Sequence, residues 1–350
     1  KGVIPKLPIF ALLSVDRALK KVNRLAAGLD LEKPWKSHRA QEWDGITAEH
    51  WIQAHVPTAI GKELMRIATR AIFSAEPSEM SFLFFLSYVR SAETIEMLAD
   101  VEGAAQQDRV RGGAFQIARR LAERIGMDSI HLSSPVQTIE QSESGVRIVA
   151  GNLDVRAKRA IVAMSPSLTL GIRFERPPVG RLTMARRMPM GSVTKSIIAY
   201  DSPFWRKKDY AGMAVSDRGP FGPVFDACLP NDERGYLVGF LEGEEGRRYA
   251  LESEEARRTA ILENLTRWFG SEAAESIGYV EKNWTMDEWS GGCYTGLMTP
   301  GTMTNYGDLL RTPSGRIHWA GTETATEWMG YFDGAVESGQ RAAKEVMAGE

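Results

Sequence analysis

Apolar residues recur at helical spacing through the first part of the chain. One series consists of Leu19, Val22, Leu25 and Leu29, and a second consists of Ile60, Leu64, Ile67 and Ala71. Intervals of three and four residues place side chains on one face of an α-helix, so both series predict amphipathic helices. We therefore expect residues 1 to about 110 to be mainly helical.

The next segment changes from a helix to strands. Ile117, Leu121 and Ile125 are spaced by four along one helix face, and Gly126 is placed to end that helix. The segments PVQTIEQ and GVRIVA then flank the turn-like SESG, and DVRAKRAIVAMSP runs to a Ser-Pro stop. We expect a sheet of short strands after the helix.

Strand-like runs return between residues 190 and 245, in SVTKSIIAY and GYLVGFLEG. The charged segment LEGEEGRR, which overlaps the second run, is interpreted as a solvated turn. From Ser253 to Phe269 the pattern predicts a helix that ends at Gly270. Its buried residues are expected to be Ile261, Leu262, Leu265 and Trp268.

The C-terminal segment combines a strand, a loop and a helix. RIHWAG is typical of a buried strand, TETATEWMGYFDG of a loop, and GAVESGQRAAKEV of a helix. That helix has a face of small residues that would permit close packing, namely Ala335, Gly339, Ala342 and Ala343. A loop that leads into a helix N-terminus can offer backbone N–H groups to an anionic ligand. Helical and sheet-rich segments alternate twice, which predicts two domains that interleave along the chain.

Composition excludes several classes of protein. The 350 residues are 43% apolar and 25% charged, which suffices for about two domains with cores. The 43 Lys and Arg residues against 45 Asp and Glu residues give a net charge of -2, without the basic excess of a nucleic-acid-binding surface. The longest strongly apolar runs, such as residues 81–89, are too short to span a bilayer, so we expect a soluble protein.

Few residues suggest chemistry by themselves. Cys228 and Cys293 belong to no CxxC or zinc-spaced cluster, which favours a reducing compartment and predicts no metal site. In WSGGCYTG, the glycines beside Cys293 and Tyr294 would let a flat ligand approach closely, although a structural cysteine is the simpler alternative. Tyr294 and Tyr331 could each be core residues. Lys195 lies in an apolar, strand-like segment, where burying its positive charge would be costly. The alternative is that it points to solvent from an edge strand.

The segment GRIHWAGTETATEWMGYFDGAVESGQRAAKEV, with EKNWTMDEWSGGCYTG, closely resembles the C-terminal half of flavin-dependent monoamine oxidases. The resemblance extends upstream through MGSVTKSIIAYDSPFWRKKDYAG and RGGAFQIARRLAERIG to KPWKSHRAQEWDGIT, and so covers nearly the whole chain. It implies an enzyme that uses FAD to oxidise an amine to an imine, passes the electrons to oxygen, and releases an aldehyde, ammonia and hydrogen peroxide.

The resemblance also implies a mixed α/β fold of two domains. A Rossmann-like FAD-binding domain would comprise residues 112–185 and 287–350, and a substrate domain would comprise residues 1–111 and 186–286. The family begins with a βαβ unit that carries GxGxxG, and this motif does not occur in the chain. We therefore expect about a hundred N-terminal residues to lie elsewhere, for example on a separate chain that acts as a partner.

The resemblance assigns roles to individual residues. Lys195 matches the family lysine that contacts flavin N5 through a water molecule, and Tyr294 and Tyr331 match two tyrosines that form an aromatic cage before the flavin. Cys293 matches the residue that bonds the flavin 8α-methyl group as a thioether in mammalian members, whereas several bacterial relatives bind FAD without that link. Further cofactor contacts are implied for Trp284, Val136, Gly321, Thr322, Glu323, Met329 and Gly330.

The implied substrate cavity includes Gln106, with Ala71 and Ile72 near its entrance. Where mammalian enzymes have a cavity tyrosine, this chain reads PVFDAC, so Phe225 or Asp226 would line the pocket. If Asp226 faces the cavity it would favour a diamine such as putrescine, and the alternative is an exposed turn aspartate. An L-amino-acid oxidase would need an arginine in the cavity to clamp the carboxylate, and none matches such a position.

The remaining expectations concern partners and location. Besides the amine and oxygen, a homodimer is compatible with the resemblance. The sequence stops at Glu350 without the membrane anchor of mitochondrial relatives, which leads us to expect a cytoplasmic enzyme. A non-catalytic fragment that has lost its cofactor is the alternative from a different class of protein.

Overall fold

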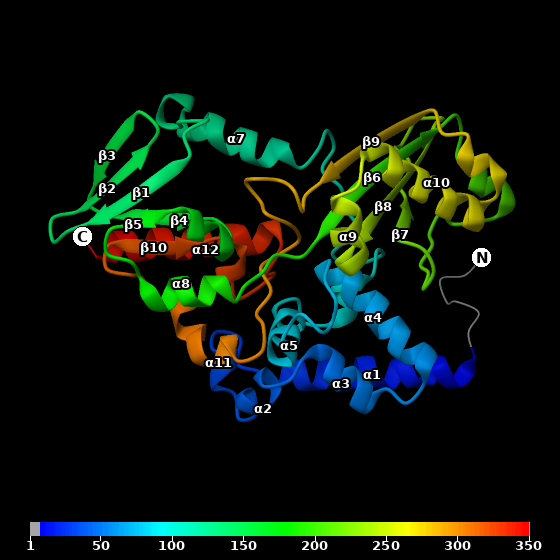
Figure 1. Ribbon diagram of the computed structural model, residues 1–350, viewed down its shortest axis with the longest axis horizontal. Coiled ribbons are helices and arrows are strands. Elements are labelled where there is room, and N and C mark those ends of the chain that lie inside the picture. The colour runs from blue at the N-terminus through cyan, green and yellow to red at the C-terminus, as the bar shows by residue number, and fades with distance from the viewer. Residues whose placement is uncertain (1–7, 350) are drawn as a thin grey trace.

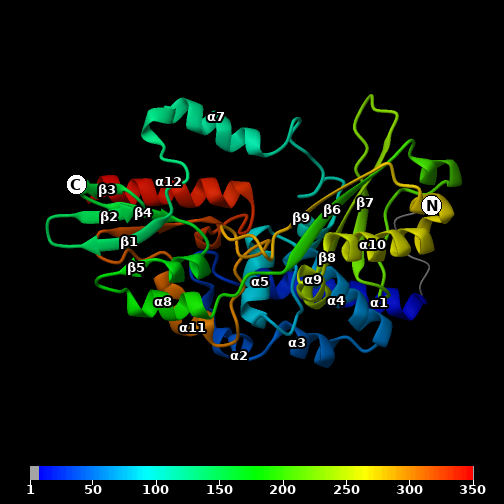
Figure 2. The same cartoon turned by 45° about the horizontal axis from the view of Figure 1, so that its top comes forward.

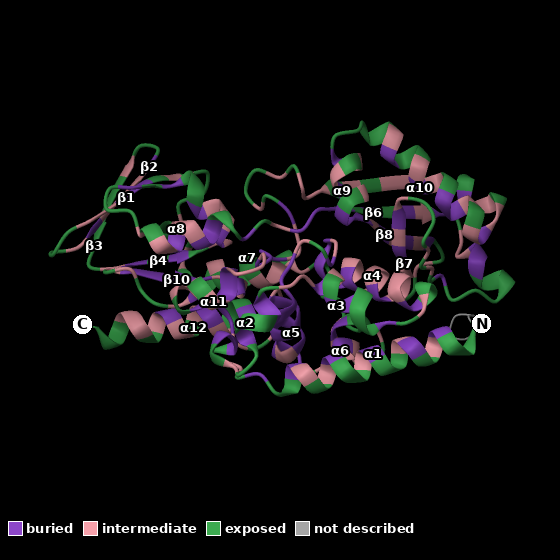
Figure 3. Ribbon diagram, turned by 60° about the horizontal axis from the view of Figure 1, so that its bottom comes forward, coloured by how far each residue is buried: buried purple, intermediate pink, exposed green. Residues whose placement is uncertain are grey.

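Helices build the first part of the chain, as the two apolar series predict. The structure, a computed structural model, describes residues 8–349. Its first helices are α1 (Ile9–Ala27), α2 (Ala40–Asp44), α3 (Ala48–His55), α4 (Ala59–Phe73), α5 (Phe82–Ser91) and α6 (Ile95–Ala99). Side-chain hydroxyl groups of Thr47, Thr58, Ser81 and Thr94 cap the starts of α3 to α6. Nine of the ten residues of helix α5 are buried, so the helix has neighbours on nearly all sides (Figure 3).

Two small sheets form the end of the molecule where the C-terminus lies (Figure 1). The first has the order β3-β2-β1-β5 and consists of β1 (Val136–Gln141), β2 (Val146–Ala150), β3 (Leu153–Ala157) and β5 (Arg173–Phe174). The second pairs β4 (Ala160–Ala163) in parallel with β10 (Ile317–Ala320), which comes from a distant part of the chain. All four residues of β10 are buried, as predicted.

The helices of this end are α8 (Val179–Arg186), α11 (Thr302–Tyr306) and α12 (Phe332–Ala348). On α12, Ala342 is buried whereas Ala335 is exposed. Close packing along the whole small-residue face was therefore a wrong expectation, because only part of that face has a neighbour in the described residues.

A third sheet, of order β7-β8-β6-β9, lies at the opposite end of the molecule (Figure 1). Its strands are antiparallel, and with the neighbouring helices they are β6 (Val193–Tyr200), β7 (Phe221–Asp226), β8 (Gly235–Glu242), α9 (Gly243–Ala250), α10 (Glu254–Phe269) and β9 (Gly278–Asn283). Ile261 and Leu265 of α10 pack against one face of the sheet, while Leu262 and Trp268 are half-buried. Gly270 ends the helix as predicted.

The segment LEGEEGRR is not a turn. Its first two residues end β8, and the rest forms the first six residues of helix α9. Glu244 and Glu245 occupy the first turn of that helix, and Arg247 and Arg248 occupy the last turn. This order of charges complements the helix dipole, which explains why a segment of such high polarity is helical.

Helix α7 (Phe115–Ile125) lies along the outer side of the molecule, apart from the sheets (Figure 2). It ends at Gly126, whose φ of 96° suits glycine, as the spacing predicts. None of its residues is buried, and Phe115, Leu121 and Ile125 are 78%, 49% and 65% exposed. Of the predicted apolar face, Ile117 is half-buried, whereas Leu121 and Ile125 are exposed within the described residues. The domain boundaries stay a prediction.

Candidate active site

One face of the third sheet collects the first group of candidate residues. Lys195 on β6 is in register with Phe240 on β8, and Val238 on β8 is in register with Phe225 on β7. Residues two apart on a strand point to the same face, so these four side chains share one face of the sheet. The Lys195 ammonium lies over the Phe240 ring, 5.9 Å from its centroid.

The lysine is not buried. Lys195 lies on a central strand, not an edge strand, yet its side chain is exposed, as is that of Ile197 on the same face. Of the two alternatives for Lys195, the exposed side chain is therefore the one found, although it projects from a central strand and not from an edge strand. No ion pair of Lys195 occurs within residues 8–349, whereas its cross-strand neighbour Lys282 pairs with Asp287 at 2.6 Å. The ammonium of Lys195 is thus available to a ligand on this face.

Tyr294 lies on the same sheet face. Its ring meets that of Phe240 edge to face, with centroids 6.3 Å apart and an interplanar angle of 80°. Its hydroxyl donates to Glu242 Oε1 at 3.0 Å. The pKa of Tyr294 is raised well above its ordinary value. Burial is the larger cause and the nearby Glu242 is the second, so the phenol is neutral at physiological pH.

The backbone around Cys293 is held between two other segments. Cys293 N–H donates to the carbonyl oxygen of Gly191, and Gly191 N–H donates to that of Thr295. A Cβ on Gly191 would lie closer than 3.0 Å to the carbonyl oxygens of both Cys293 and Phe73, so glycine is required for this close approach. Burial raises the pKa of the Cys293 thiol to about 11, and the Lys195 charge opposes this shift.

The loop between β10 and α12 supplies a second group. The turn starts at Gly321, which has a φ of 112° and donates its N–H to the Ser338 hydroxyl. The Thr322 hydroxyl donates to the carbonyl oxygen of Tyr331 at 3.0 Å and accepts from Gly330 N–H at 2.7 Å, so it closes the loop on itself. The Glu323 carboxylate is buried and accepts from the Gly296 N–H at 3.2 Å.

Tyr331 precedes α12 and its ring meets Trp328 edge to face, with centroids 5.4 Å apart. Burial raises the pKa of Tyr331 to about 12, and a hydrogen bond with the Gln106 side chain opposes this. The structure thus brings Gln106, a predicted cavity residue, against one of the predicted cage tyrosines. Met329, which precedes Gly330 in the loop, is buried and donates its N–H to Ser91.

Tyr88 joins the two groups, and nothing in the sequence indicates its position. It lies on buried helix α5, and the pKa of its phenol is raised well above the ordinary value by burial and then by Tyr331, Glu323 and Cys293. A Cβ on Gly330 would lie closer than 3.0 Å to the Tyr88 hydroxyl. The Cys293 and Tyr331 segments therefore meet around one buried tyrosine, whose apolar helix resembles ordinary core in the sequence.

Asp226 does not face this region. It is in register with Leu237, on the buried face of the sheet opposite to Phe225. Its carboxylate accepts from Trp205 Nε1 at 2.9 Å, from the Arg206 guanidinium at 2.8 Å and from Cys228 N–H. Of the two alternatives from PVFDAC, the structure therefore places Phe225 on the Lys195 face, and the idea that Asp226 receives a second ammonium group is wrong.

The remaining predicted site residues are Ile72, Ala71, Trp284 and Val136. Ile72, at the end of α4, is 5% exposed within the helical core, and Ala71 beside it is half-buried. Trp284 continues from β9 and donates its backbone N–H to Val193, two residues from Lys195. Val136 begins β1 in the first sheet, and no contact within the described residues joins it to the Lys195 face.

The chain matches the model of a known family over residues 4–347, described as flavin containing amine oxidoreductase. It is 40% identical over 339 residues to a probable flavin-containing monoamine oxidase A of Dictyostelium discoideum, covering 96% of this chain and 74% of that protein. No helix within residues 8–349 has the length and apolar character needed to cross a membrane.

Two solved structures share the fold closely. Cyclohexylamine oxidase from Brevibacterium oxydans superposes with a TM-score of 0.92 at 33% identity, covering 99% of this chain and 76% of that one. Wild-type putrescine oxidase bound to putrescine superposes with a TM-score of 0.93 at 30% identity, covering 99% of this chain and 78% of that one. The mixed helix-and-sheet architecture is thus that of flavin amine oxidases, as the resemblance implies.

Proposed function

The chain belongs to the family of flavin-containing amine oxidoreductases, and we propose that Lys195, Tyr294 and Tyr331 carry its chemistry. The function is FAD-dependent oxidation of an amine. The observation that supports the three assignments is that the Cys293 turn and the Tyr331 loop meet around Tyr88, and that the Lys195 charge acts on the Cys293 thiol.

The residues at this convergence fit a flavin. Helix α12 begins after Tyr331 without a side-chain cap among the described residues, so its first N–H groups suit an electron-rich ligand edge. Lys195 has no ion pair within residues 8–349, and the glycines at 191, 321 and 330 let backbone approach closely. We propose that Gly321, Thr322, Glu323, Met329 and Gly330 hold the flavin end of FAD, with Trp284 beside it and Val136 near the adenine end.

The chain's own residues would bind and orient the amine. Bound FAD supplies the acceptor for the two electrons and the hydrogen that the amine carbon loses, and oxygen then takes them up to give hydrogen peroxide. Tyr294 and Tyr331 are neutral phenols because burial raises the pKa of each, so both can present a ring face to the amine nitrogen. Gln106 holds the Tyr331 hydroxyl, and Phe225 and Phe240 keep the adjoining sheet face apolar.

An amine panel tests this function directly. We expect the FAD-loaded protein to form one hydrogen peroxide per amine consumed, with an apolar monoamine such as benzylamine preferred to putrescine because Asp226 is already paired with Arg206. Arg109 donates to the carbonyl oxygens of Ala227 and Cys228, so it is not free to clamp an amino-acid carboxylate. Preferential oxidation of an L-amino acid would overturn the substrate proposal.

The Cys293 thiol gives a second test. We propose that it would form a thioether with the flavin methyl group, because it lies within the field of Lys195 and its segment is fixed by Gly191. The thiol would lose its S–H hydrogen and the methyl group one C–H hydrogen, and oxygen would take up both hydrogens with their two electrons as hydrogen peroxide. In the Cys293→Ala variant, we expect flavin to be released completely on acid denaturation, whereas the wild type retains it. Cys228→Ala is the matched control, since that thiol accepts from Tyr236 N–H at the other side of the sheet. Yellow colour in denatured Cys293→Ala protein would refute the link.

We further propose that a dinucleotide-binding βαβ unit covers the exposed faces near α7. A parallel strand pair such as β4 and β10 is ordinarily part of a sheet with helices on both sides, yet Ile161 of β4 is 42% exposed. The exposed apolar side chains of α7, namely Phe115, Leu121 and Ile125, would be buried by the same unit. Intact mass and an absorbance spectrum of the native enzyme test this, and they also show whether the unit is a separate polypeptide or whether the enzyme is a homodimer.

A further inference from the structure

A buried carboxyl group lies directly behind one of the cage tyrosines. Glu242 is the last residue of β8 and points to the same sheet face as Phe240. It is 4% exposed, its Oε1 accepts the Tyr294 hydroxyl at 3.0 Å, and its Oε2 is buried without a hydrogen-bond partner within residues 8–349. The Ser74 hydroxyl, also buried and unpaired in that part of the chain, lies beside both Glu242 and Tyr294.

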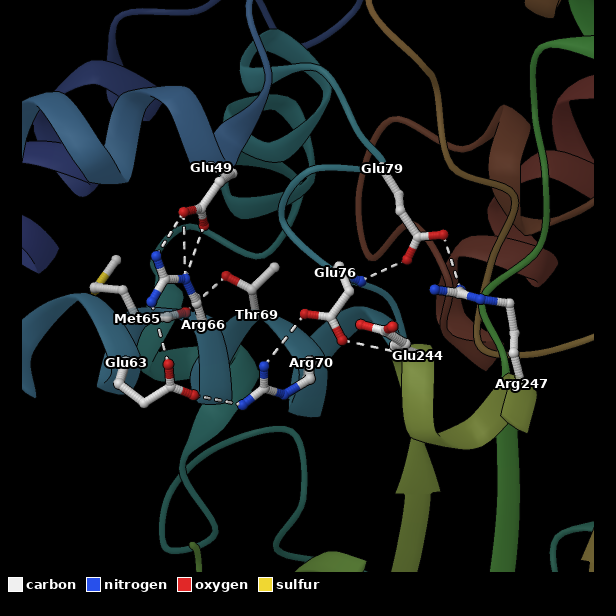
Figure 4. A network of polar contacts seen from close by, with 10 residues as sticks. All are labelled: Glu49, Glu63, Met65, Arg66, Thr69, Arg70, Glu76, Glu79, Glu244 and Arg247. Atoms are coloured by element: carbon white, nitrogen blue, oxygen red, sulfur yellow. Dashed lines mark hydrogen bonds and ion pairs between the residues drawn. The ribbon is translucent and has the colours of Figure 1, made fainter. Parts of the chain in front are cut away.

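The charged groups around Glu242 do not neutralise it. Arg70 of α4 is the cation that acts on it, but the Arg70 guanidinium is engaged by Glu63 at 2.9 Å and by Glu76 at 3.2 Å (Figure 4). Glu76 also repels a negative charge on Glu242. Burial is the largest effect and raises the pKa of Glu242 to about 8, while Tyr294, Arg70 and Ser74 oppose it.

Glu242 lies at the border of a polar cavity. It lines a cavity of about 440 Å³ together with Glu63, Glu76 and Glu244, on the side of Glu242 where α4 and α9 lie. Figure 4 shows that Glu76, in the loop after α4, accepts from the Arg70 guanidinium of α4 and from the Glu244 N–H at the start of α9. The carboxyl group therefore separates a polar cavity from the Tyr294 ring.

We propose that Glu242 is a positioning residue for Tyr294, and that its ionisation strengthens the binding of a cationic amine in the aromatic cage. The hydrogen bond fixes the phenol, and the ring lies edge-on to Phe240, so the Tyr294 ring has one defined orientation. When Glu242 is ionised, its negative charge lies beyond the hydroxyl end of that ring. A cation over the ring face is then attracted by the carboxylate as well as by the ring.

A quaternary ammonium ion tests this proposal, which rests on the proposed function. Benzyltrimethylammonium keeps its charge at every pH and has no lone pair to be oxidised. With the FAD-loaded enzyme, we expect its affinity as a competitive inhibitor to rise roughly tenfold as pH passes from about 6.5 to about 9, the size expected for charges roughly 10 Å apart at an effective dielectric of about 20. Glu242→Gln keeps the hydrogen bond but cannot ionise, so its inhibition should not change with pH.

The Tyr294→Phe variant separates two effects of Glu242: the hydrogen bond that orients the Tyr294 ring, and the electrostatic effect of the carboxylate charge. Without the hydroxyl, the ring is no longer tied to Glu242. In that background we expect Glu242→Gln to lose its pH-independent effect on KM, whereas the pH-dependent effect of the carboxylate charge remains. The other polar groups near the cage, among them Cys293 and Tyr331, are unchanged in all variants, so the difference between the wild type and Glu242→Gln reports on Glu242 alone. An identical pH response in these two proteins would overturn the proposal.

Stability of the chain without cofactor gives an independent measurement. The pKa of Glu242 is higher in the folded protein than its ordinary 4.5, so the native state holds a proton that the unfolded chain releases between about pH 4.5 and 8. Stability from this group is present at low pH and is lost as pH rises to about 8. We expect the wild type to fall below Glu242→Gln in melting temperature over that interval. A constant difference would contradict the proposal, whereas absence of amine oxidation would contradict only the proposed function.

Discussion

Replacing Gly191 by alanine is expected to destabilise the protein by about 3 kcal/mol and to abolish amine oxidation. The new Cβ would lie closer than 3.0 Å to two carbonyl oxygens, those of Cys293 and Phe73. Neither can rotate away as a side chain could, because both belong to the main chain. The Cys293–Tyr294 segment must therefore move, and with it the thiol and the cage phenol.

Chemical unfolding and retention of flavin measure this effect. Gly171→Ala is the matched control, since Gly171 is exposed, a Cβ there meets nothing within 4 Å, and its φ is not positive. We expect that control to keep its stability within about 0.5 kcal/mol and to bind flavin normally. If Gly191→Ala unfolds at the same denaturant concentration as Gly171→Ala, the Cys293 turn is not held as tightly as its contacts indicate.

Local patterns predicted most of the secondary structure. The helices predicted from the apolar series are found as α1, α4 and α10, and Gly126 ends α7, because these signals depend only on neighbours in sequence. The predicted faces are only partly the buried ones, since Ile60 is 41% exposed and Leu262 and Trp268 are half-buried. The solvated-turn interpretation of residues 241–248 was wrong because high polarity was given more weight than the order of its charges. The family resemblance supplied most of the candidate site, and the structure then showed which of those residues lie together.

Positions that depend on pairing between distant segments could not be predicted. Phe225 and Asp226 are adjacent, and a register shift between Phe221 and Val224 makes it impossible to infer from alternation alone which of them faces Lys195. Glu242 and Tyr294 are 52 residues apart, and nothing in GYLVGFLEG indicates that its glutamate is buried. Tyr88 was hidden in the same way, within a helix whose other residues are ordinary core.

Replacing Lys195 by methionine is expected to slow amine oxidation by about 10²-fold or more while leaving the fold intact. The ammonium is exposed on the sheet face, so methionine costs no buried ion pair, and the long side chain can still cover the Phe240 ring. The substitution removes the ammonium group, and with it the positive charge that acts on Cys293 and the hydrogen-bond donor that we assign to the flavin edge. Rapid mixing with amine, and separately with oxygen, shows which half of the reaction requires the lysine.

Lys282→Met is the control that makes this result specific. Lys282 is in register with Lys195 and points to the same face, but its ammonium pairs with Asp287 at 2.6 Å. Both variants remove one positive charge from the same sheet face, so a field effect would slow them equally. If Lys195 acts at the reacting atoms, Lys195→Met oxidises the amine slowly even with flavin fully bound. The oxidation rate of Lys282→Met should then differ from that of the wild type by less than about threefold. Equal rates in both half-reactions for Lys195→Met and wild type would remove the lysine from the mechanism and leave the two tyrosines as its protein part.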